Sequence, residues 1–135
     1  MAKLRIGIAH GPDDEIATGR SERRERRKSD VQEVADVLGR SGHDVFSVIV
    51  DGRRECLAKL AGVEADLLFN LVEGFGDDDT KEPHVAAYYE LLGLRYTGSS
   101  PRGLSLAMDK ALTKKVLQFH GVQTPKFVTV FRGRV

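Results

Sequence analysis

Short apolar segments that alternate with helical ones constrain this sequence more than any other feature. Residues 4–9, 44–50 and 65–71 are rich in Val, Ile, Leu and Ala, and two segments with helical periodicity, residues 29–41 and 53–61, separate them. Strands that are apolar on both faces and alternate with helices are typical of a parallel sheet with right-handed crossovers. The sequence therefore predicts an α/β fold built on a parallel sheet.

The alternation continues in the second half of the chain. The further predicted elements are, in chain order, a helix at residues 83–92, a short strand at 94–97, a helix at 104–120 that is broken near Asp109, and a final strand at 126–131. Glycines at 93 and 121 follow the two helices, as is common at helix C-termini. We place one domain boundary near Ser100, between an α/β domain at residues 1–100 and an extension at residues 101–135.

Composition and charge limit the classes of partner that this chain is expected to bind. The chain is 41% hydrophobic and 30% charged, as expected for a globular protein, and its net charge of +1 gives no reason to expect nucleic acid or a membrane as partner. The apolar run at the N-terminus is too short for a signal peptide or a membrane span. Cys56 is the single cysteine, so no internal disulfide can form, and a cytoplasmic location is expected.

A run of charged residues at 20–28 follows the first predicted strand. Six of its nine residues are Arg or Lys, and Glu22 and Glu25 are interleaved with them. Mixed charge runs are usually solvated, so the favoured interpretation is a solvent-exposed loop or first helical turn. The alternative is a surface that contacts an anionic substrate or a phosphate.

Ligands of open parallel sheets bind beyond the carboxyl ends of the strands. One loop expected there, residues 73–79, carries four carboxylates and two glycines. Asp favours turns and helix N-caps, so we interpret the loop mainly as turn and capping chemistry, with a substrate-facing Glu73 or Asp as the alternative. A metal site is not predicted, because no second segment supplies converging oxygen ligands.

Lys110 lies near a predicted helix start, after the Gly/Ser turn at residues 97–100. An ammonium group and free N–H groups at a helix start can together bind a phosphate. Spacing alone would favour a solvent-facing helical lysine.

Four motifs in order carry a family resemblance. They are NLVEGFGDDDT at 70–80, ELLGLRYTGS at 90–99, AMDKALTKK at 107–115 and GVQTP at 121–125. Together they resemble the D-alanine–D-alanine ligases and their ATP-grasp relatives, over roughly the last two-thirds of the chain. The resemblance implies a Rossmann-like pre-ATP-grasp domain at residues 1–100 and a truncated first part of the ATP-grasp central domain at 101–135. It also implies that Lys110, in the Met-Asp-Lys motif, contacts an ATP phosphate.

The same resemblance suggests residues that bind the first substrate. Glu22 or Glu25 would replace the family's N-terminal glutamate, which contacts the substrate amine. Glu73 lies where the typical ligase has a His-Gly pair, which favours an amino acid or carboxylate other than D-alanine as substrate. Ser99, in the turn that leads out of the first domain, is a further candidate for substrate binding.

The implied activity is that of an ATP-dependent carboxylate–amine ligase of peptidoglycan biosynthesis. Such enzymes use ATP and Mg²⁺, form an acyl phosphate and then an amide, and commonly dimerise. The family's Mg²⁺ ligands and most of its catalytic domain are missing from these 135 residues, so no catalytic residue is assigned and the chain by itself is expected to be inactive.

Homodimerisation is expected through the helix at 83–92, where Tyr88 and Tyr89 are adjacent and one ring can face a partner. Two other functions remain as alternatives. One is a non-catalytic interaction or dimerisation module. The other is a phosphoacceptor signalling domain, which Asp13 and Asp14 would suit but which needs an Asp where this chain has Asn70.

Overall fold

The computed structural model describes residues 2–12 and 21–130, with side chains described for 2–12 and 30–130. The elements of this part are, in order, β1 (Arg5–His10), α1 (Ser21–Arg40), β2 (Asp44–Ile49), α2 (Arg54–Ala61), β3 (Leu67–Leu71), the short 3-10 helix η1 (Asp79–Lys81), α3 (Glu82–Leu91), α4 (Pro101–Met108) and α5 (Lys110–Phe119).

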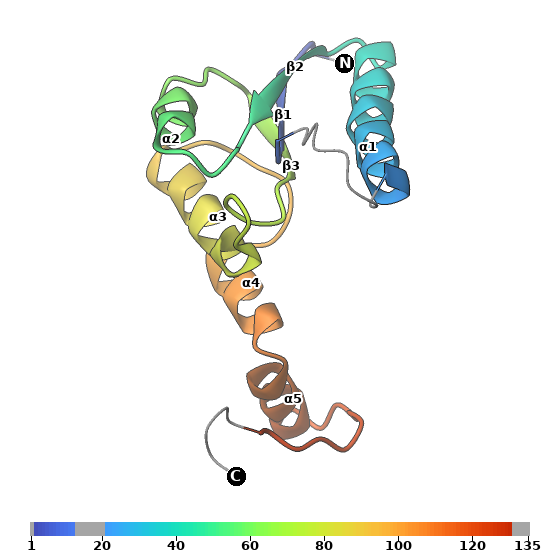
Figure 1. Ribbon diagram of the computed structural model, residues 1–135, viewed down its shortest axis with the longest axis vertical. Helices are drawn as coiled ribbons and strands as arrows, with labels where there is room; N and C mark the ends of the chain where they lie inside the picture. Colours follow the sequence, from blue (N-terminus) through green and yellow to red (C-terminus); the bar gives the residue numbers. More distant parts are fainter. Residues whose placement is uncertain (1, 13–20, 131–135) are drawn as a thin grey trace.

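The sheet is parallel, with strand order β2-β1-β3. Helix α1 lies on one side of it, and α2 and α3 lie on the other (Figure 1). This arrangement confirms the predicted α/β fold. Because all three strands run the same way, their carboxyl ends meet at one edge of the sheet.

The main core lies between the sheet and helices α2 and α3. Its buried members are Ala9, Val48, Val50, Cys56, Leu60, Leu68, Val72, Val85 and Tyr89. Gly7 contributes by its lack of a side chain, since a Cβ there would lie 2.9 Å from Leu68 Cδ2 and 3.0 Å from a Val48 methyl group. Ile6 and Ile8 alternate with these positions and are buried on the face toward α1. Strand β1 is therefore apolar on both faces, as its sequence predicts.

Helix α1 begins earlier than predicted. A helix was expected at residues 29–41, with the charged run at 20–28 as a loop or a first turn, but the helix starts at Ser21 and includes most of that run. Arg, Lys and Glu are good helix formers, and opposite charges three or four residues apart stabilise a helix further. On α1, Val34 and Leu38 are half-buried, whereas Val37 is 52% exposed.

The predicted fourth strand at residues 94–97 is wrong. Within the part of the chain that the structure describes, one isolated bridge, from Leu68 to Tyr96, extends the sheet beyond β3. It consists of Leu68 N–H donating to the Arg95 carbonyl at 2.8 Å and Thr97 N–H donating to the Leu68 carbonyl at 2.9 Å. The segment between Gly93 and Gly98 is too short for a longer ladder, because both glycines adopt positive φ and turn the chain.

The predicted final strand is also wrong for residues 126–130, which form no strand in the described chain. The segment has strong β propensity, but a strand needs a hydrogen-bonded neighbour, and no described strand pairs with residues 126–130. Val128 and Val130 are accordingly 86% and 79% exposed.

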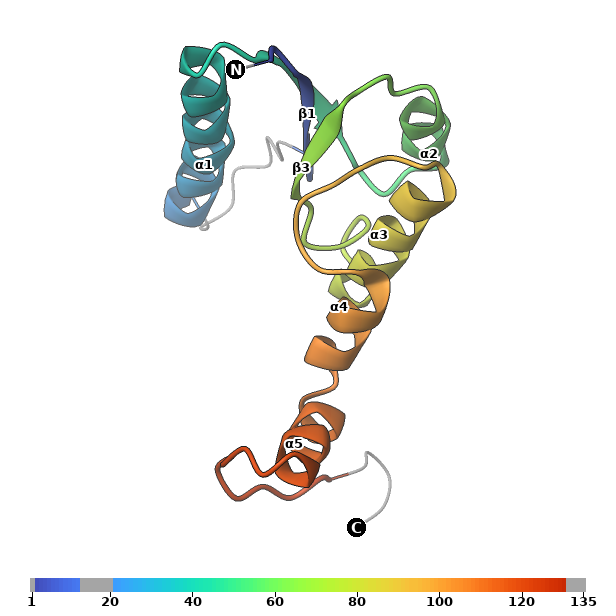
Figure 2. The same ribbon diagram turned by 180° about the vertical axis from the view of Figure 1, so that it is seen from behind.

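The long C-terminal helix is broken as predicted, at Asp109. Its first half, α4, starts at Pro101 rather than at residue 104, because the Ser100 hydroxyl caps it by accepting from Gly103 N–H at 3.3 Å. Helix α4 packs against α3, and α5 continues away from the sheet at the far end of the molecule (Figures 1 and 2).

Candidate functional site

Two loops meet at the carboxyl edge of the sheet. Gly52, after β2, and Gly76, after β3, have φ of +79° and +65°. A Cβ on Gly52 would lie 2.3 Å from Gly76 Cα, so the two backbones are in direct contact. Both positions need glycine, one for the close approach and both for the positive φ. The contact fixes the two loops to each other at the edge where ligands bind in folds of this kind.

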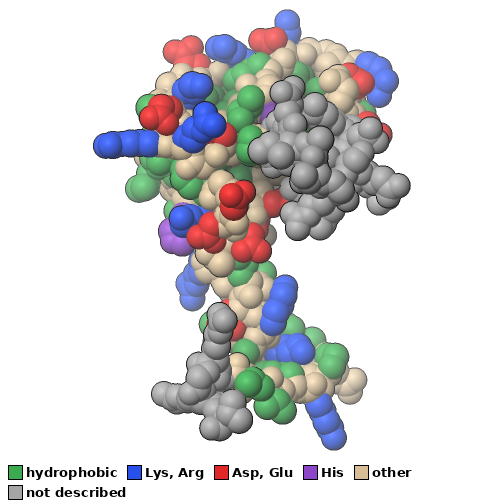
Figure 3. Space-filling model, viewed as in Figure 1, with side chains coloured by type: hydrophobic (Ala, Val, Ile, Leu, Met, Phe, Trp, Pro, Cys, Tyr) green, Lys and Arg blue, Asp and Glu red, His purple; other side chains and the backbone are tan. Residues whose placement is uncertain are grey.

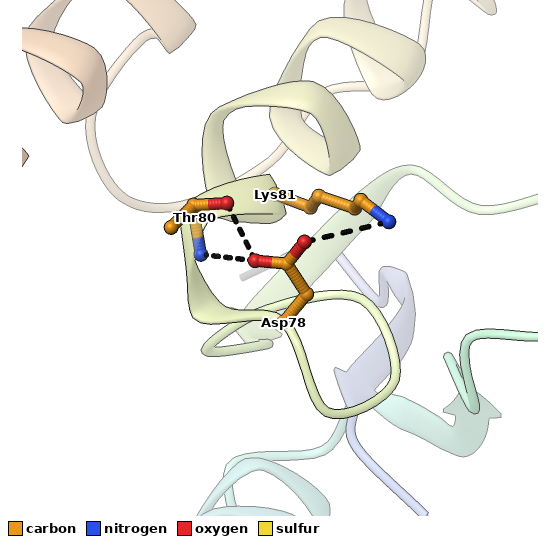
Figure 4. Close-up of polar contacts among 3 residues, drawn as sticks. All are labelled: Asp78, Thr80 and Lys81. Atoms are coloured by element: carbon orange, nitrogen blue, oxygen red, sulfur yellow. Dashed lines mark hydrogen bonds and ion pairs between the residues drawn. The ribbon is translucent and has the colours of Figure 1, made fainter.

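The acidic loop after β3 is organised by Asp78. Its carboxylate accepts from Thr80 N–H at 3.0 Å and from the Thr80 hydroxyl, and it forms an ion pair with Lys81 at 3.4 Å (Figure 4). The hydrogen bond from the Thr80 hydroxyl holds the pKa of Asp78 below its usual value. The predicted capping role is thereby confirmed for Asp78, which is the N-cap of η1.

His10, at the end of β1, is a buried polar residue that the sequence interpretation missed. It is 7% exposed and hydrogen-bonded through both ring nitrogens. Nδ1 donates to the Gly11 carbonyl at 2.7 Å, and Nε2 pairs with the Ser47 hydroxyl of β2 at 2.7 Å. A carbonyl can only accept, so this geometry places a proton on Nδ1. The available signal was a polar residue that ends an otherwise apolar strand.

Asp51 is a second missed residue at this edge. Its carboxylate accepts from Arg53 N–H at 3.0 Å, and this hydrogen bond lowers the pKa of Asp51. The neighbouring Cys56 thiol is buried in the core, and burial raises its pKa. The loop after β2 is thus ordered by local hydrogen bonds, as is the loop after β3.

Lys110 is the first residue of α5 and its side chain is exposed. The preceding residue, Asp109, caps the helix by accepting from Leu112 N–H at 2.9 Å. The backbone N–H groups at the first two positions of an α-helix have no partner within the helix. Lys110 therefore lies at a helix start, where the helix dipole favours an anion, and its role in phosphate binding stays a prediction.

The predicted substrate residues lie at several places. Glu73 is exposed directly after β3, and Ser99 is exposed in the turn before α4. The backbones of Glu22 and Glu25 lie in the first two turns of α1, and their side chains are outside the described residues. Helix α4 separates Ser99 from Lys110, and its eight residues correspond to a rise of roughly 12 Å. The described contacts do not bring the candidates together into one site.

Three carboxylates of the acidic loop, those of Glu73, Asp77 and Asp79, are exposed, and Figure 3 shows acidic side chains gathered on this face of the molecule. Nevertheless, no three His, Cys, Asp or Glu side chains among the described residues are arranged to hold a metal ion. Within residues 2–12 and 21–130, no helix is both long and apolar enough to span a bilayer.

An open hollow of about 690 Å³ lies beside α5. It is lined by Lys115, Gln118, Lys126, Phe127 and Val128. Lys114 lies over the Phe127 ring, with its ammonium 5.1 Å from the ring centroid. Glu73, Ser99 and Lys110 are not among these lining residues.

Comparisons with known proteins point to one group of enzymes. A D-alanine–D-alanine ligase from Anaplasma centrale is 33% identical over 96% of this chain and 63% of its own length. A second, from Moorella thermoacetica, is 37% identical over 82% of this chain and 34% of its own length. This chain thus spans less than two thirds of each relative. No protein-family profile matches the chain.

The fold agrees with the sequence comparison. The crystal structure of the Bacillus anthracis D-alanine–D-alanine ligase complexed with ATP superposes with a TM-score of 0.75 at 20% identity, over 98% of this chain and 41% of that one. The matched region has the α/β architecture of the ligase N-terminal domain. This chain is therefore related to the D-alanine–D-alanine ligase family, and it corresponds to the N-terminal part of those proteins.

Proposed function

We propose that this chain is the N-terminal part of an ATP-dependent ligase that joins a carboxylate to an amine. The observation that carries the proposal is the sequence relationship to D-alanine–D-alanine ligases, which extends over nearly the whole chain at 33% identity. The start of α5 supports it, because Lys110 lies there beside backbone N–H groups that have no acceptor within the helix.

In the proposed reaction a substrate carboxylate oxygen attacks the γ-phosphorus of ATP, forming an acyl phosphate and releasing ADP. The amine nitrogen of the second substrate then attacks the acyl carbon, and inorganic phosphate leaves. Lys110 would bind an ATP phosphate, since a cation at that position offsets the charge on the transferred group. Mg²⁺ would serve the same purpose, but the described residues supply no ligand set for it.

The carboxyl edge of the sheet would bind the first substrate. A carboxylate at Glu73 suits the ammonium group of an amino acid, and the Ser99 hydroxyl can donate to its carboxylate. Glu22 or Glu25 would contribute from α1. The substrate would be an amino acid or related carboxylate, with D-alanine as the family precedent. Cytoplasmic peptidoglycan synthesis, with the enzyme acting as a homodimer, is the corresponding setting.

Calorimetric titration with Mg²⁺-ATP tests the proposed role of Lys110. Lys110→Gln removes the charge and should weaken ATP binding about tenfold, the usual effect of losing one charge-assisted hydrogen bond. Lys59→Gln, an exposed lysine on α2, is the matched control and should leave binding unchanged. The affinity of the chain for inorganic tripolyphosphate should fall to the same extent in Lys110→Gln. Equal ATP affinity of the two variants would refute the proposed role.

A non-catalytic interaction module is the second candidate function. The exposed apolar side chains beyond the sheet favour it, among them Phe119 at 87% and Val128 at 86% exposure. Large exposed apolar groups that lie near one another often mark a contact surface. Self-association with no effect of nucleotide would favour this function over the ligase.

A further inference from the structure

The junction between α4 and α5 is a single residue wide. Helix α4 ends at Met108, α5 begins at Lys110, and Asp109 between them has φ −83° and ψ +88°, outside the helical region. One non-helical residue is enough to redirect a helix axis, because it interrupts the i to i−4 hydrogen bonds. The direction of α5 is therefore set at Asp109.

Two side chains organise this break, and one of them, Thr113, spans it. The Asp109 carboxylate accepts from Leu112 N–H at 2.9 Å, which starts the new helix. The Thr113 hydroxyl donates to the Leu106 carbonyl, across seven residues and from α5 back to the last turn of α4. Carbonyls in the last turn of a helix have no intrahelical partner, so Thr113 satisfies a group that the break would leave open.

Little else holds α5 in place. Among the described elements it packs mainly on α4, and it has no fully buried residue of its own. Both ribbon views show it at the far end of the molecule from the sheet, joined to the rest through α4 (Figures 1 and 2). With so few packing contacts, local hydrogen bonds dominate the choice of orientation.

We infer that Asp109 and Thr113 are positioning residues that fix the orientation of α5, and with it the direction in which Lys110 faces. Asp109 ends one helix and starts the next, and Thr113 holds the angle between them. The consequence for ATP rests on the proposed role of Lys110, whereas the hinge itself does not.

The angle can be measured with two spin labels in the full chain, on Arg102→Cys of α4 and Gln118→Cys of α5, both exposed positions. Cys56 can stay, because its burial and raised pKa keep the thiol from reacting readily. Thr113→Val removes the hydroxyl at nearly constant shape and should broaden or shift the distance distribution between the labels. Thr113→Ser should restore it, and Thr129→Val, on an exposed threonine of the C-terminal segment, should leave it unchanged.

A second readout separates positioning from stability. Thr113→Val should weaken Mg²⁺-ATP binding roughly threefold to tenfold, the range for one hydrogen bond, while Thr113→Ser binds as the parent does. The melting temperature of the sheet domain should not change, since α5 does not contact the main core. An unaltered label distance in Thr113→Val overturns the hinge. A parent chain that does not bind ATP refutes the proposed function, and the distance measurement still decides the hinge.

Discussion

Residue-scale chemistry is best defined in the two loops that meet at the carboxyl edge of the sheet. The sequence predicted turn and capping roles for the acidic loop, and Asp78 confirms them. It did not predict the contact of Gly52 with Gly76 or the hydrogen bond of His10 with Ser47, because each joins segments distant in the chain. Local hydrogen-bonding preferences can be predicted from the sequence, whereas contacts between loops depend on how the strands assemble into the sheet.

Gly52→Ala should lower the free energy of unfolding by more than the roughly 1–3 kcal/mol that a strained backbone costs. The added Cβ would meet Gly76 Cα at 2.3 Å in a backbone with positive φ. Gly93→Ala is the matched control within the sheet domain, because Gly93 also has positive φ (+69°) but nothing lies within 4 Å of its Cβ position. Urea unfolding of both variants separates the contact from the dihedral strain. Equal losses would mean that the two loops do not touch.

The capping bonds of Asp78 predict a pH dependence. The pKa of this carboxyl is lowered in the folded chain, chiefly by the hydrogen bond from the Thr80 hydroxyl. A lowered folded pKa gives stability that is present above the unfolded pKa, near 3.8, and is lost as the pH falls through the folded value. The stability difference between the parent and Asp78→Asn should therefore be present at pH 6 and shrink below about pH 4. Asp77→Asn serves as the control, and a difference that does not vary with pH would contradict the assignment.

Element boundaries show where prediction from sequence succeeds. The three buried strands and the break at Asp109 follow from apolar patterning and a capping residue, and both were predicted. The strand expected at 126–131 failed for residues 126–130, because β propensity produces a strand only where another strand is adjacent. The predicted helix was shorter than α1. The first turns of α1 consist of charged residues, so they lack the apolar periodicity from which a helix is predicted.

Ser100→Ala should destabilise α4 by about 1 kcal/mol, the typical cost of losing an N-cap. The Ser100 hydroxyl accepts from Gly103 N–H at 3.3 Å at the start of the helix. Ser99→Ala changes the neighbouring residue in the same way without removing that cap, and should be neutral. Amide exchange in the first turn of α4 would report the difference. Unchanged exchange rates in Ser100→Ala would show that Pro101 alone is enough to start the helix.

At the scale of the whole molecule, a sheet domain with a buried core carries an arm, α4 and α5, that has no fully buried residue. The alignment with the Moorella thermoacetica ligase covers 110 residues, which are 34% of that protein's length. We therefore expect the purified 135-residue chain to show neither ATP hydrolysis nor ATP-dependent dipeptide formation. A coupled assay for ADP release, run with D-alanine and with other amino acids, checks this. ADP release that rises with substrate and is lost in Lys110→Gln would prove the expectation wrong.

Self-association was predicted through helix α3, and the structure changes which side chain could mediate it. Tyr88 is half-buried and donates to the Leu57 carbonyl at 3.0 Å, so its hydroxyl is used within the chain. The exposed apolar residue of α3 is instead Leu91, at 84%, and Phe119 at the end of α5 is exposed to 87%.

Burial of such side chains against a second copy would remove apolar surface from water, the main driving force of association. Sedimentation equilibrium at micromolar concentration should give a mass above that of the monomer. Leu91→Glu should reduce it if α3 forms the interface, and Phe119→Glu should reduce it if α5 does. Gln118→Glu adds the same charge beside Phe119 and should have no effect. A monomer mass for the parent chain at every concentration would exclude a dimer, and with it a dimerisation module.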